Sequence, residues 1–259
     1  MSRQLYLNSF SALLPDGIYS SLGFIPWTDG QKGPQDVTRR QILDKPYVNF
    51  GKLMLPDKLA FGAASLILAR YGLPDKEKTA ITLGICAGSL STDLRYMETV
   101  AAGFPGPAVF SATLPSSAIA DIAIYFGLKG PNRVCAGNAA SGLTAFELAT
   151  LLLQSGKADS ALVLSVNAVE PGDFECPLLG PAIARENRAV AFLVSTAPQN
   201  QGLGFRLNAS FGQSDKEVPC DSGELYFTEL TRMLLHRKTG SVAASSCGMS
   251  ADITITKEL

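Results

Sequence analysis

The chain has 259 residues, of which 46% are hydrophobic and 17% are charged, and its formal net charge is −1. A chain of this length can bury a sizeable core without disulfides or a structural metal. The balance of 22 Lys and Arg against 23 Asp and Glu argues against a nucleic-acid-binding protein, which would carry a basic excess. The single histidine, His236, excludes a zinc site built on several histidines and restricts Ser–His or Cys–His catalysis to that residue.

The five cysteines form no C-x-x-C pair, so they predict neither a disulfide framework nor a zinc ribbon. The N-terminal residues lack the basic and then apolar layout of a signal peptide. No stretch approaches the roughly 18 uninterrupted apolar residues of a membrane span. We therefore expect a soluble, cytoplasmic protein with reduced thiols, no metal, no cofactor and no membrane span.

In chain order, residues 4–14 are expected to form a strand that ends at the turn Pro15-Asp16-Gly17. Residues 18–50 are predicted to be an ordered loop or insertion. The side chains that need burial in this segment are Phe24, Ile25, Trp27 and Phe50. A helix is expected over residues 56–71, with Gly72 at its C-terminal cap.

Between residues 79 and 196, apolar strand patterns alternate with helical patterns. The predicted strands are residues 79–87, 133–137, 160–168 and 188–196, and the predicted helices are residues 93–103, 116–126 and 140–155. Gly127 and Gly156 follow two of these helices, as is typical of a C-terminal cap. The alternation predicts βαβ units and a largely parallel sheet.

After residue 198 the pattern changes. Residues 198–222 are polar and glycine-rich, and residues 239–250 are predicted to be a loop. A helix is expected over residues 225–236, with Phe227, Leu230 and Leu234 on one face, and a strand over residues 251–256. This tail is too short for a separate α/β domain, so we expect it to complete or dock on the preceding one.

Two short segments could carry a nucleophile. The run from Gly84 to Gly88, with Cys86 at its centre, fits the G-x-nucleophile-x-G pattern of a nucleophile elbow. That motif requires a helix immediately afterwards, whereas residues 88–92 read as a loop, so a buried strand cysteine is the favoured interpretation of Cys86.

The second segment, residues 137–143, is a turn of small residues between a strand and a helix, where helix N–H groups point at the turn. Its tip is Ala139, which has no reactive atom. Ser141 is the nearest nucleophile, and no histidine lies at a recognisable spacing from it. We therefore favour the interpretation of Ser141 as an ordinary residue of the first helical turn. His236 ends a helix, where a cation interacts favourably with the helix dipole.

The sequence around this turn resembles that of a known family. Residues 126–132 (FGLKGPN), the strand that begins at Arg133, the small turn and residues 144–149 (TAFELA) together resemble the β-ketoacyl synthase pattern. In that family, FGLKGP precedes an edge strand, and A-C-S-S-G-L-x-A carries the catalytic cysteine at the head of a buried helix. The resemblance extends from about residue 47 to 197, and further similar segments are residues 107–117, 154–168 and 247–252.

The chain departs from this family at its catalytic residues. Aligned on Ser141-Gly142-Leu143, the cysteine position is occupied by Ala139, and Cys135 lies four residues earlier. Active members also use two histidines, or a histidine and an asparagine, from the second half of a duplicated thiolase-like fold. Most of that half is missing here, and His236 lies in no matching motif. The resemblance therefore implies no catalytic residue in this chain.

What remains resembles a chain length factor, a cysteine-less subunit that pairs with an active ketosynthase and shapes its acyl cavity. A shortened version is the partner of the ketosynthase in aryl polyene gene clusters. The implied fold is a thiolase-like layered α/β/α fold, with a near-complete half over residues 1–197. Residues 198–259 would be a reduced remnant that packs on this half as part of a single structural unit. The implied partners are an active β-ketoacyl-ACP synthase in a heterodimer and, through that complex, an acyl carrier protein.

In this family the strand before the nucleophile turn pairs with its counterpart in the other subunit. The residues implied at this interface are Arg133, Val134, Cys135, Ala136 and Gly137. Val109, Phe110 and Thr113 are candidates for lining the acyl pocket of the partner, and ordinary packing within this chain is the alternative. Two rival functions stay open: a small acyltransferase or hydrolase that uses Cys86 or Ser141, and a homodimeric protein that binds acyl carrier protein.

Overall fold

The structure is a computed structural model. It describes residues 3–43, 45–71, 75–170, 186–199, 202–213, 221–246 and 249–257, with only the backbone given for residues 70–71, 221–226 and 246. In chain order the elements are β1 (Leu5–Leu14), β2 (Gly17–Ser20), β3 (Gly23–Pro26), the 3-10 turn η1 (Pro34–Asp36), α1 (Arg39–Ile42), η2 (Phe50–Lys52), α2 (Leu55–Tyr71), β4 (Thr79–Ile85), α3 (Leu90–Ala101), α4 (Pro107–Ser111), α5 (Ser117–Phe126), β5 (Asn132–Ala136), α6 (Ser141–Gln154), β6 (Ser160–Asn167), β7 (Arg188–Ser195), β8 (Phe205–Gln213), α7 (Asp221–Leu235), β9 (Gly240–Ser246) and β10 (Met249–Lys257).

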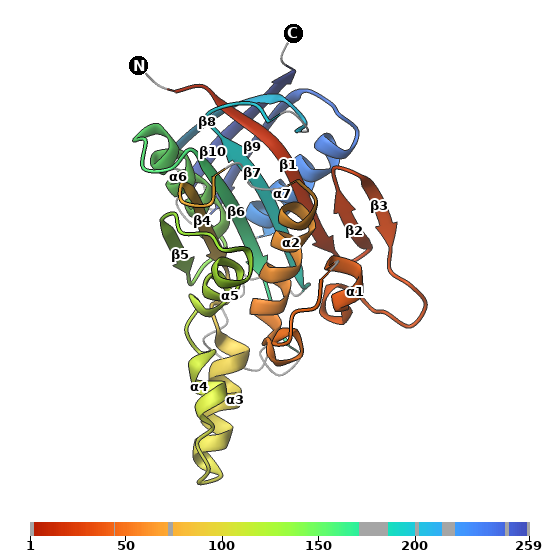
Figure 1. The fold of residues 1–259 in the computed structure, drawn as a ribbon, viewed down its shortest axis with the longest axis vertical. Coiled ribbons are helices and arrows are strands. Elements are labelled where there is room, and N and C mark those ends of the chain that lie inside the picture. Colours follow the sequence, from red (N-terminus) through yellow and green to blue (C-terminus); the bar gives the residue numbers. More distant parts are fainter. Residues whose placement is uncertain are drawn as a thin grey trace.

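A single mixed sheet connects these strands. Its order is β5-β4-β6-β7-β1-β8-β10-β9, and β2 and β3 are attached to β1 (Figure 1). Only β5, β4 and β6 pair in parallel, whereas the other pairs are antiparallel. The prediction of a largely parallel sheet is therefore wrong. Parallel pairing is confined to strands that helical crossovers connect, while β9 and β10 follow each other directly as a hairpin.

Helices cover the two faces of the sheet, and two hydrophobic clusters result. Figure 1 shows α2 and α5 in front of the sheet and α7 behind it. The first cluster contains Phe61 of α2 and Ile122 of α5, packed on β4, β6 and β7. The second contains Phe146 of α6 and Phe227 of α7. Together they give the layered α/β/α arrangement that the resemblance implies.

The C-terminal tail supplies part of the second cluster. Phe227, Leu230 and Leu234 are at most 1% exposed, which confirms the predicted helix face. The ring of Phe227 stacks on Phe146, with centroids 6.1 Å apart, and meets Phe192 of β7 at 5.5 Å. The tail therefore completes the core of the preceding residues and continues their sheet. The boundary at residue 197 stays a prediction.

Two strands of the tail were not expected. β8 lies in the segment 198–222, and β9 occupies most of the predicted loop 239–250. Both have weak strand signals, since β9 reads GSVAASS and β8 contains Asn, Ser and Gly, which are depleted in strands. Their pairing with β10 decides the structure, because each is held along its length by that central strand.

The segment 18–50 is more regular than a loop, because β2 and β3 form a hairpin on β1. Phe24 and Ile25 lie on the outer strand β3 and are 44% and 53% exposed, so the expectation that they are buried is wrong. Trp27 is half-buried and donates its indole N–H to the Leu14 carbonyl at 2.9 Å, and Phe50 is buried as expected.

The remaining differences concern helices. α3 begins at Leu90 and not at residue 93, and the segment 107–117 contains the short helix α4. Gly127 and Gly156 have φ of 70° and 71°, which confirms the expected turns after α5 and α6. Gly72 lies outside the described residues.

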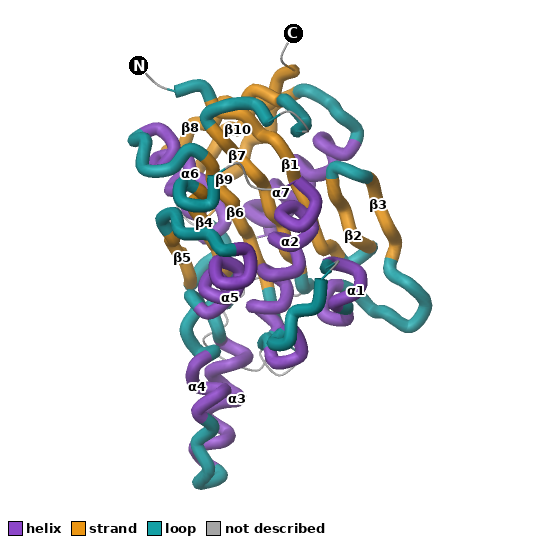
Figure 2. The backbone as a smooth tube through the Cα atoms, viewed as in Figure 1, coloured by secondary structure: helices purple, strands orange, loops and turns teal. Residues whose placement is uncertain are grey.

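α3 and α4 leave the body of the molecule as a two-helix projection, which Figure 2 shows clearly. We refer to residues 90–111 as the hairpin. None of the helices in the described part of the chain is both long and apolar enough to cross a membrane.

Candidate functional site

The turn between β5 and α6 packs tightly against β4. Gly137 has φ of 117°, a conformation that favours glycine. The side-chain oxygen of Asn138 accepts the Ala140 N–H at 2.9 Å, and the Asn138 N–H donates to the Ser141 hydroxyl at 3.3 Å. A β-carbon at Gly84 of β4 would lie only 2.2 Å from the Ser141 carbonyl oxygen. The turn is therefore fixed by its own hydrogen bonds and by close contact with β4.

The side chain at the tip of this turn is a methyl group. Ala139 is 4% exposed and offers neither a nucleophile nor a proton carrier. Ser141 is 3% exposed and is the first residue of α6, where its hydroxyl accepts the hydrogen bond from the turn. This geometry agrees with the interpretation of Ser141 as a residue of the first helical turn. The alignment of Ser141 with the family pattern stays a prediction.

Cys86 follows β4 and is 2% exposed. Its backbone N–H donates to the Val166 carbonyl of β6 at 3.1 Å, so the residue continues the strand pairing. The helix after it begins sooner than expected, at Leu90, which corrects the argument that a loop separates Cys86 from the next helix. Burial of the thiol is the stronger argument against a nucleophile here. His236 is exposed just beyond α7.

β5 forms one edge of the sheet, and β4 is its single partner among the strands that the structure describes. The Ile81 N–H donates to the Pro131 carbonyl, and the Gly137 N–H donates to the Ile85 carbonyl. The backbone N–H and C=O groups alternate in direction along a strand. Those of residues 133 and 135 therefore point toward β4, and those of residues 132, 134 and 136 point toward the open edge. The Asn132 carbonyl accepts from the Arg133 guanidinium at 2.7 Å, and the N–H and C=O groups of residues 134 and 136 face the open edge, where another strand can pair with them.

The side chains of β5 are only partly covered. Val134 and Cys135 are half-buried, and Arg133 and Ala136 are exposed. Burial raises the pKa of the Cys135 thiol, so the neutral thiol is the favoured form. These four residues and Gly137 are the ones that the sequence placed at a partner interface, and the structure brings them together on an accessible edge.

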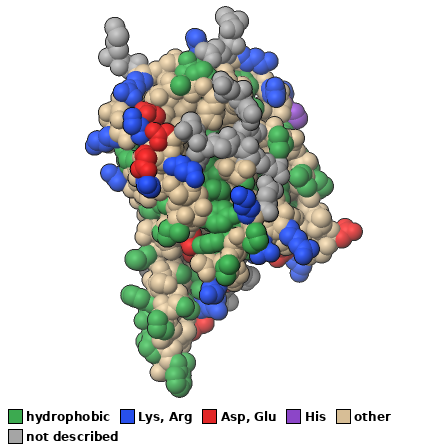
Figure 3. Space-filling view, viewed as in Figure 1, with side chains coloured by type: hydrophobic (Ala, Val, Ile, Leu, Met, Phe, Trp, Pro, Cys, Tyr) green, Lys and Arg blue, Asp and Glu red, His purple; other side chains and the backbone are tan. Residues whose placement is uncertain are grey.

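The hairpin and the turn that follows it expose large apolar side chains. Figure 3 shows hydrophobic side chains over this projection. Phe104 at its tip is 83% exposed, Phe110 58% and Leu114 62%. Met97 and Val100 of α3 are also exposed. Residues 99–120 contain no charged side chain, whereas Glu98 and Asp121 flank them. An apolar surface of this kind on a projection is typical of an interface.

The three candidate lining residues lie on this projection. Phe110 contacts Tyr96 of α3, with ring centroids 5.2 Å apart. Val109 is half-buried, and the Thr113 hydroxyl donates to the Phe110 carbonyl at 2.7 Å. The sequence reasoning missed Met97, Val100, Phe104 and Leu114. The uncharged run of residues 99–120 was a signal that could have found the last three, whereas Met97 lies outside it.

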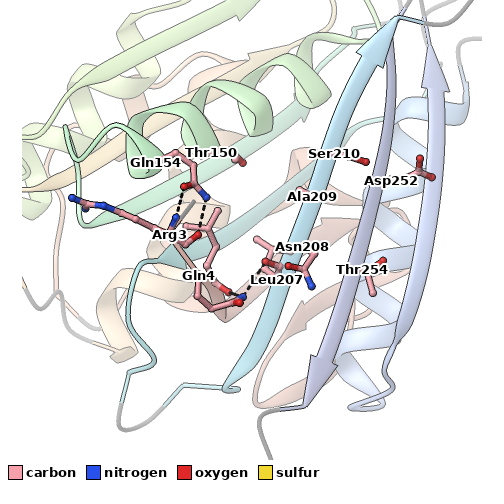
Figure 4. Close-up of a pocket in the computed structure, with 11 residues that line it drawn as sticks. Arg3, Gln4, Thr150, Gln154, Leu207, Asn208, Ala209, Ser210, Asp252 and Thr254 are labelled. Atoms are coloured by element: carbon pink, nitrogen blue, oxygen red, sulfur yellow. Dashed lines mark hydrogen bonds between the residues drawn. The ribbon is translucent and has the colours of Figure 1, made fainter. Parts of the chain in front are cut away.

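A groove of about 370 Å³ lies between α6, the N-terminal segment and strands β8 and β10 (Figure 4). Arg3 and Gln154 bridge its mouth with two hydrogen bonds, of 2.6 and 2.8 Å. The remaining lining includes Asn208, Ser210 and Asp252 from the two strands. No group of three or more His, Cys, Asp or Glu that could hold a metal is present among the described residues.

The sequence matches a known family over more than half of its length. Residues 57–197 match the family described as Beta-ketoacyl synthase, N-terminal domain. This segment runs from the first turn of α2 to just beyond β7. No curated protein matches the chain in a sequence comparison.

Solved structures resemble the whole chain. A chain of the complex between a ketosynthase and its chain length factor from Xenorhabdus doucetiae has a TM-score of 0.70 at 14% identity, with 97% of this chain and 99% of that chain covered. The ishigamide ketosynthase/chain length factor has a TM-score of 0.74 at 16% identity, with 97% of this chain and 99% of that chain covered. A type II polyketide synthase complex of an acyl-carrier protein with its ketosynthase bound to the hexaketide gives 0.70 at 10% identity, with both chains fully covered. These likenesses establish a thiolase-like α/β fold.

Proposed function

The chain belongs to the β-ketoacyl synthase family, and we propose that it is a catalytically inactive, chain-length-factor-like subunit of a β-ketoacyl-ACP synthase complex. In this proposal it forms a heterodimer with an active ketosynthase, stabilises that enzyme and helps to shape its acyl pocket. The complex would work in the cytoplasm on a polyene or fatty-acyl chain, such as an aryl polyene.

The observation that carries the proposal is the methyl group of Ala139 at the tip of the β5–α6 turn. Condensation in this family needs a nucleophile that holds the acyl chain covalently, and a methyl group cannot form a thioester. The rival reading as a small acyltransferase or hydrolase would need Cys86 or Ser141. Both side chains are at most 3% exposed, and the Ser141 hydroxyl accepts a hydrogen bond within the turn.

The interface features support a partner of the same fold. The open edge of β5 offers backbone groups at residues 132, 134 and 136, and an equivalent edge strand could pair with them. The hairpin and the turn after it carry exposed apolar side chains, and residues 99–120 contain no charge. Two of the similar structures contain a ketosynthase together with a chain length factor, which makes an active ketosynthase the partner that we propose.

The carrier protein and the acyl chain enter the proposal by the same analogy. One of the similar structures is a complex of an acyl-carrier protein with a ketosynthase that holds a hexaketide. We propose that an acyl carrier protein reaches this chain through the heterodimer. Val109, Phe110 and Thr113 would then line the far part of the partner's acyl pocket and help to define chain length.

Co-expression with the ketosynthase encoded beside this chain tests the proposal. Size-exclusion chromatography with light scattering should show one complex that contains both chains in equal number. Separate elution of the two chains contradicts the heterodimer, and a stable homodimer of this chain favours the rival reading as a homodimeric carrier-protein-binding protein. Any turnover of the complex should survive Cys86→Ala and Ser141→Ala, whereas its loss in either variant favours the enzyme reading.

A further inference from the structure

Two carboxyl groups lie together between α2 and α5. Asp57, in the first turn of α2, is 5% exposed, and its Oδ1 lies 2.8 Å from the Ser117 hydroxyl of α5. Asp121 lies one turn further along α5, and its Oδ1 accepts a 2.5 Å hydrogen bond from the Tyr47 hydroxyl. Both carboxyl groups therefore have hydroxyl groups as their hydrogen-bond partners.

The cations of the neighbouring elements are directed elsewhere. Lys58, next to Asp57 on α2, donates to the Gln35 carbonyl at 2.8 Å. Arg95 of α3 contacts the sulfur of Met54 at 3.7 Å. No ion pair among the described residues includes Asp57 or Asp121. Burial raises the pKa of Asp57 to about 7, Ser117 opposes this shift by its hydrogen bond, and the charge of Asp121 adds to it.

The Ser117 hydroxyl connects Asp57 to the base of the hairpin. Its oxygen lies 2.8 Å from Asp57 and also 2.8 Å from the Leu114 carbonyl oxygen, but the hydroxyl has only one proton to donate. When Asp57 is protonated, the carboxyl can donate to Ser117, and Ser117 can donate to Leu114. When Asp57 is ionised, the Ser117 hydroxyl must donate to the carboxylate, and the Leu114 carbonyl keeps only the hydrogen bond from the Ser117 backbone N–H at 2.9 Å.

Leu114 belongs to the turn between α4 and α5, where the hairpin returns to the body, and α5 leads directly toward β5. We propose that Asp57 and Ser117 form a proton latch, in which a protonated Asp57 holds α5 and the hairpin base in the arrangement that binds the partner. This inference rests on the proposed heterodimer. Ionisation of Asp57 would place a buried negative charge near the half-buried carboxylate of Asp121 and weaken the packing of α5 on α2.

The direction of the pH effect follows from the two states of Asp57. The folded chain keeps the proton up to about pH 7, whereas the unfolded chain loses it near the ordinary value of 3.8. The contribution of Asp57 to the free energy of unfolding is therefore fully present below the pKa of the unfolded chain, and it is lost as the pH rises toward 7. Partner affinity should fall over the upper part of the same range and beyond neutrality.

The test measures heterodimer affinity and chain stability from about pH 5.5 to about pH 8.5. For the native chain, Kd should rise roughly tenfold across this range. Asp57→Asn, which keeps a neutral side chain of similar shape, should bind with little dependence on pH. Asp252→Asn, at an exposed position of β10, is the matched control and should retain the native slope. A native slope in Asp57→Asn contradicts the latch.

Denaturant unfolding of the chain alone gives a second readout that does not need the partner. The native chain should lose stability from about pH 5.5 to about pH 7, and Asp57→Asn should lose clearly less. A flat native profile contradicts the latch even if the heterodimer forms. Failure to bind any ketosynthase at any pH contradicts the proposed function, and the unfolding profile then still decides whether Asp57 titrates as the latch requires.

Discussion

The two ends of the sheet present different surfaces. At the β5 end, backbone groups point toward an open edge, and the adjoining hairpin exposes Phe104 and Phe110. At the other end, β9 is also an edge strand, but the exposed side chains of β8 to β10 include Asn208, Ser210 and Asp252, which are polar. Their alternate neighbours are buried under α6 and α7. One end is suited to water, and the other is suited to a protein partner.

This difference matters because the resemblance implies a reduced second half. Strands β8 to β10 and helix α7 cover part of the core and turn polar side chains outward. No comparable adjustment has occurred at the β5 end, where residues 99–120 contain no charge. A chain without a protein partner would be expected to carry polar residues there too. The contrast is what we expect when catalysis is lost and partnership is kept.

The largest effect is expected in the core that the C-terminal tail helps to form. Phe227→Ala removes a side chain that is 1% exposed and contacts Phe146 and Phe192. The free energy of unfolding should fall by about 3–5 kcal/mol, because a large cavity is left in the core. Denaturant unfolding measures this loss. A fall of less than about 1 kcal/mol would mean that the tail is not an integral part of the core.

The next largest effect is expected at the open edge. Val134→Pro removes an N–H that points away from β4, so the fold of the chain should be preserved. Heterodimer affinity should fall by about 100-fold, because an interchain hydrogen bond is lost and its acceptor is left unpaired. Val134→Ala keeps the N–H and is the control. Isothermal titration of both variants with the ketosynthase gives the comparison, and equal affinities would rule out edge pairing.

A smaller effect is expected at the tip of the hairpin. Phe104→Ala should weaken the heterodimer roughly tenfold, since burying a phenyl ring is worth about 1.5–3 kcal/mol and truncation removes most of that area. Thermal unfolding of the chain alone should not change, because Phe104 is 83% exposed. Leu22→Ala, on the exposed β2–β3 turn, should leave affinity unchanged. Unchanged affinity in Phe104→Ala would separate the hairpin from the interface.

The smallest effect is expected at Ala139, in the turn between β5 and α6. Ala139→Cys supplies a thiol but not the histidines that active members of the family use, so the rate of condensation by the heterodimer should stay the same. A radiolabelled malonyl-condensation assay would measure this rate. A clear gain of activity in the variant would show that the chain retains a working active site around this position.

The sequence predicted the strongly patterned parts of this fold. The helix face of Phe227, Leu230 and Leu234 and the buried strands β4, β6 and β7 follow from apolar spacing. β9 could not be predicted, because a strand of Ser, Ala and Gly forms only through its pairing with β10. The exposure of Phe24 and Ile25 was also beyond sequence reasoning, since it depends on β3 being an outer strand.

The candidate site could also be predicted only in part from the sequence. The resemblance placed Ala139 and the β5 edge from local motifs, and β5 is an edge strand in the structure. The buried environment of Asp57 was not predictable, because an acidic residue in the first turn of a helix is usually interpreted as an exposed side chain that interacts with the helix dipole. Its hydrogen bond to Ser117 and its interaction with the charge of Asp121 arise only when α5, which is distant in sequence, packs on α2.

The most direct test of the account is the intact mass of both subunits after the co-purified heterodimer is incubated with an acyl thioester of its carrier protein. The account predicts an acyl adduct on the ketosynthase and none on this chain, because Ala139 offers no nucleophile. An acyl adduct on this chain, or one formed by the chain alone, would contradict the central claim.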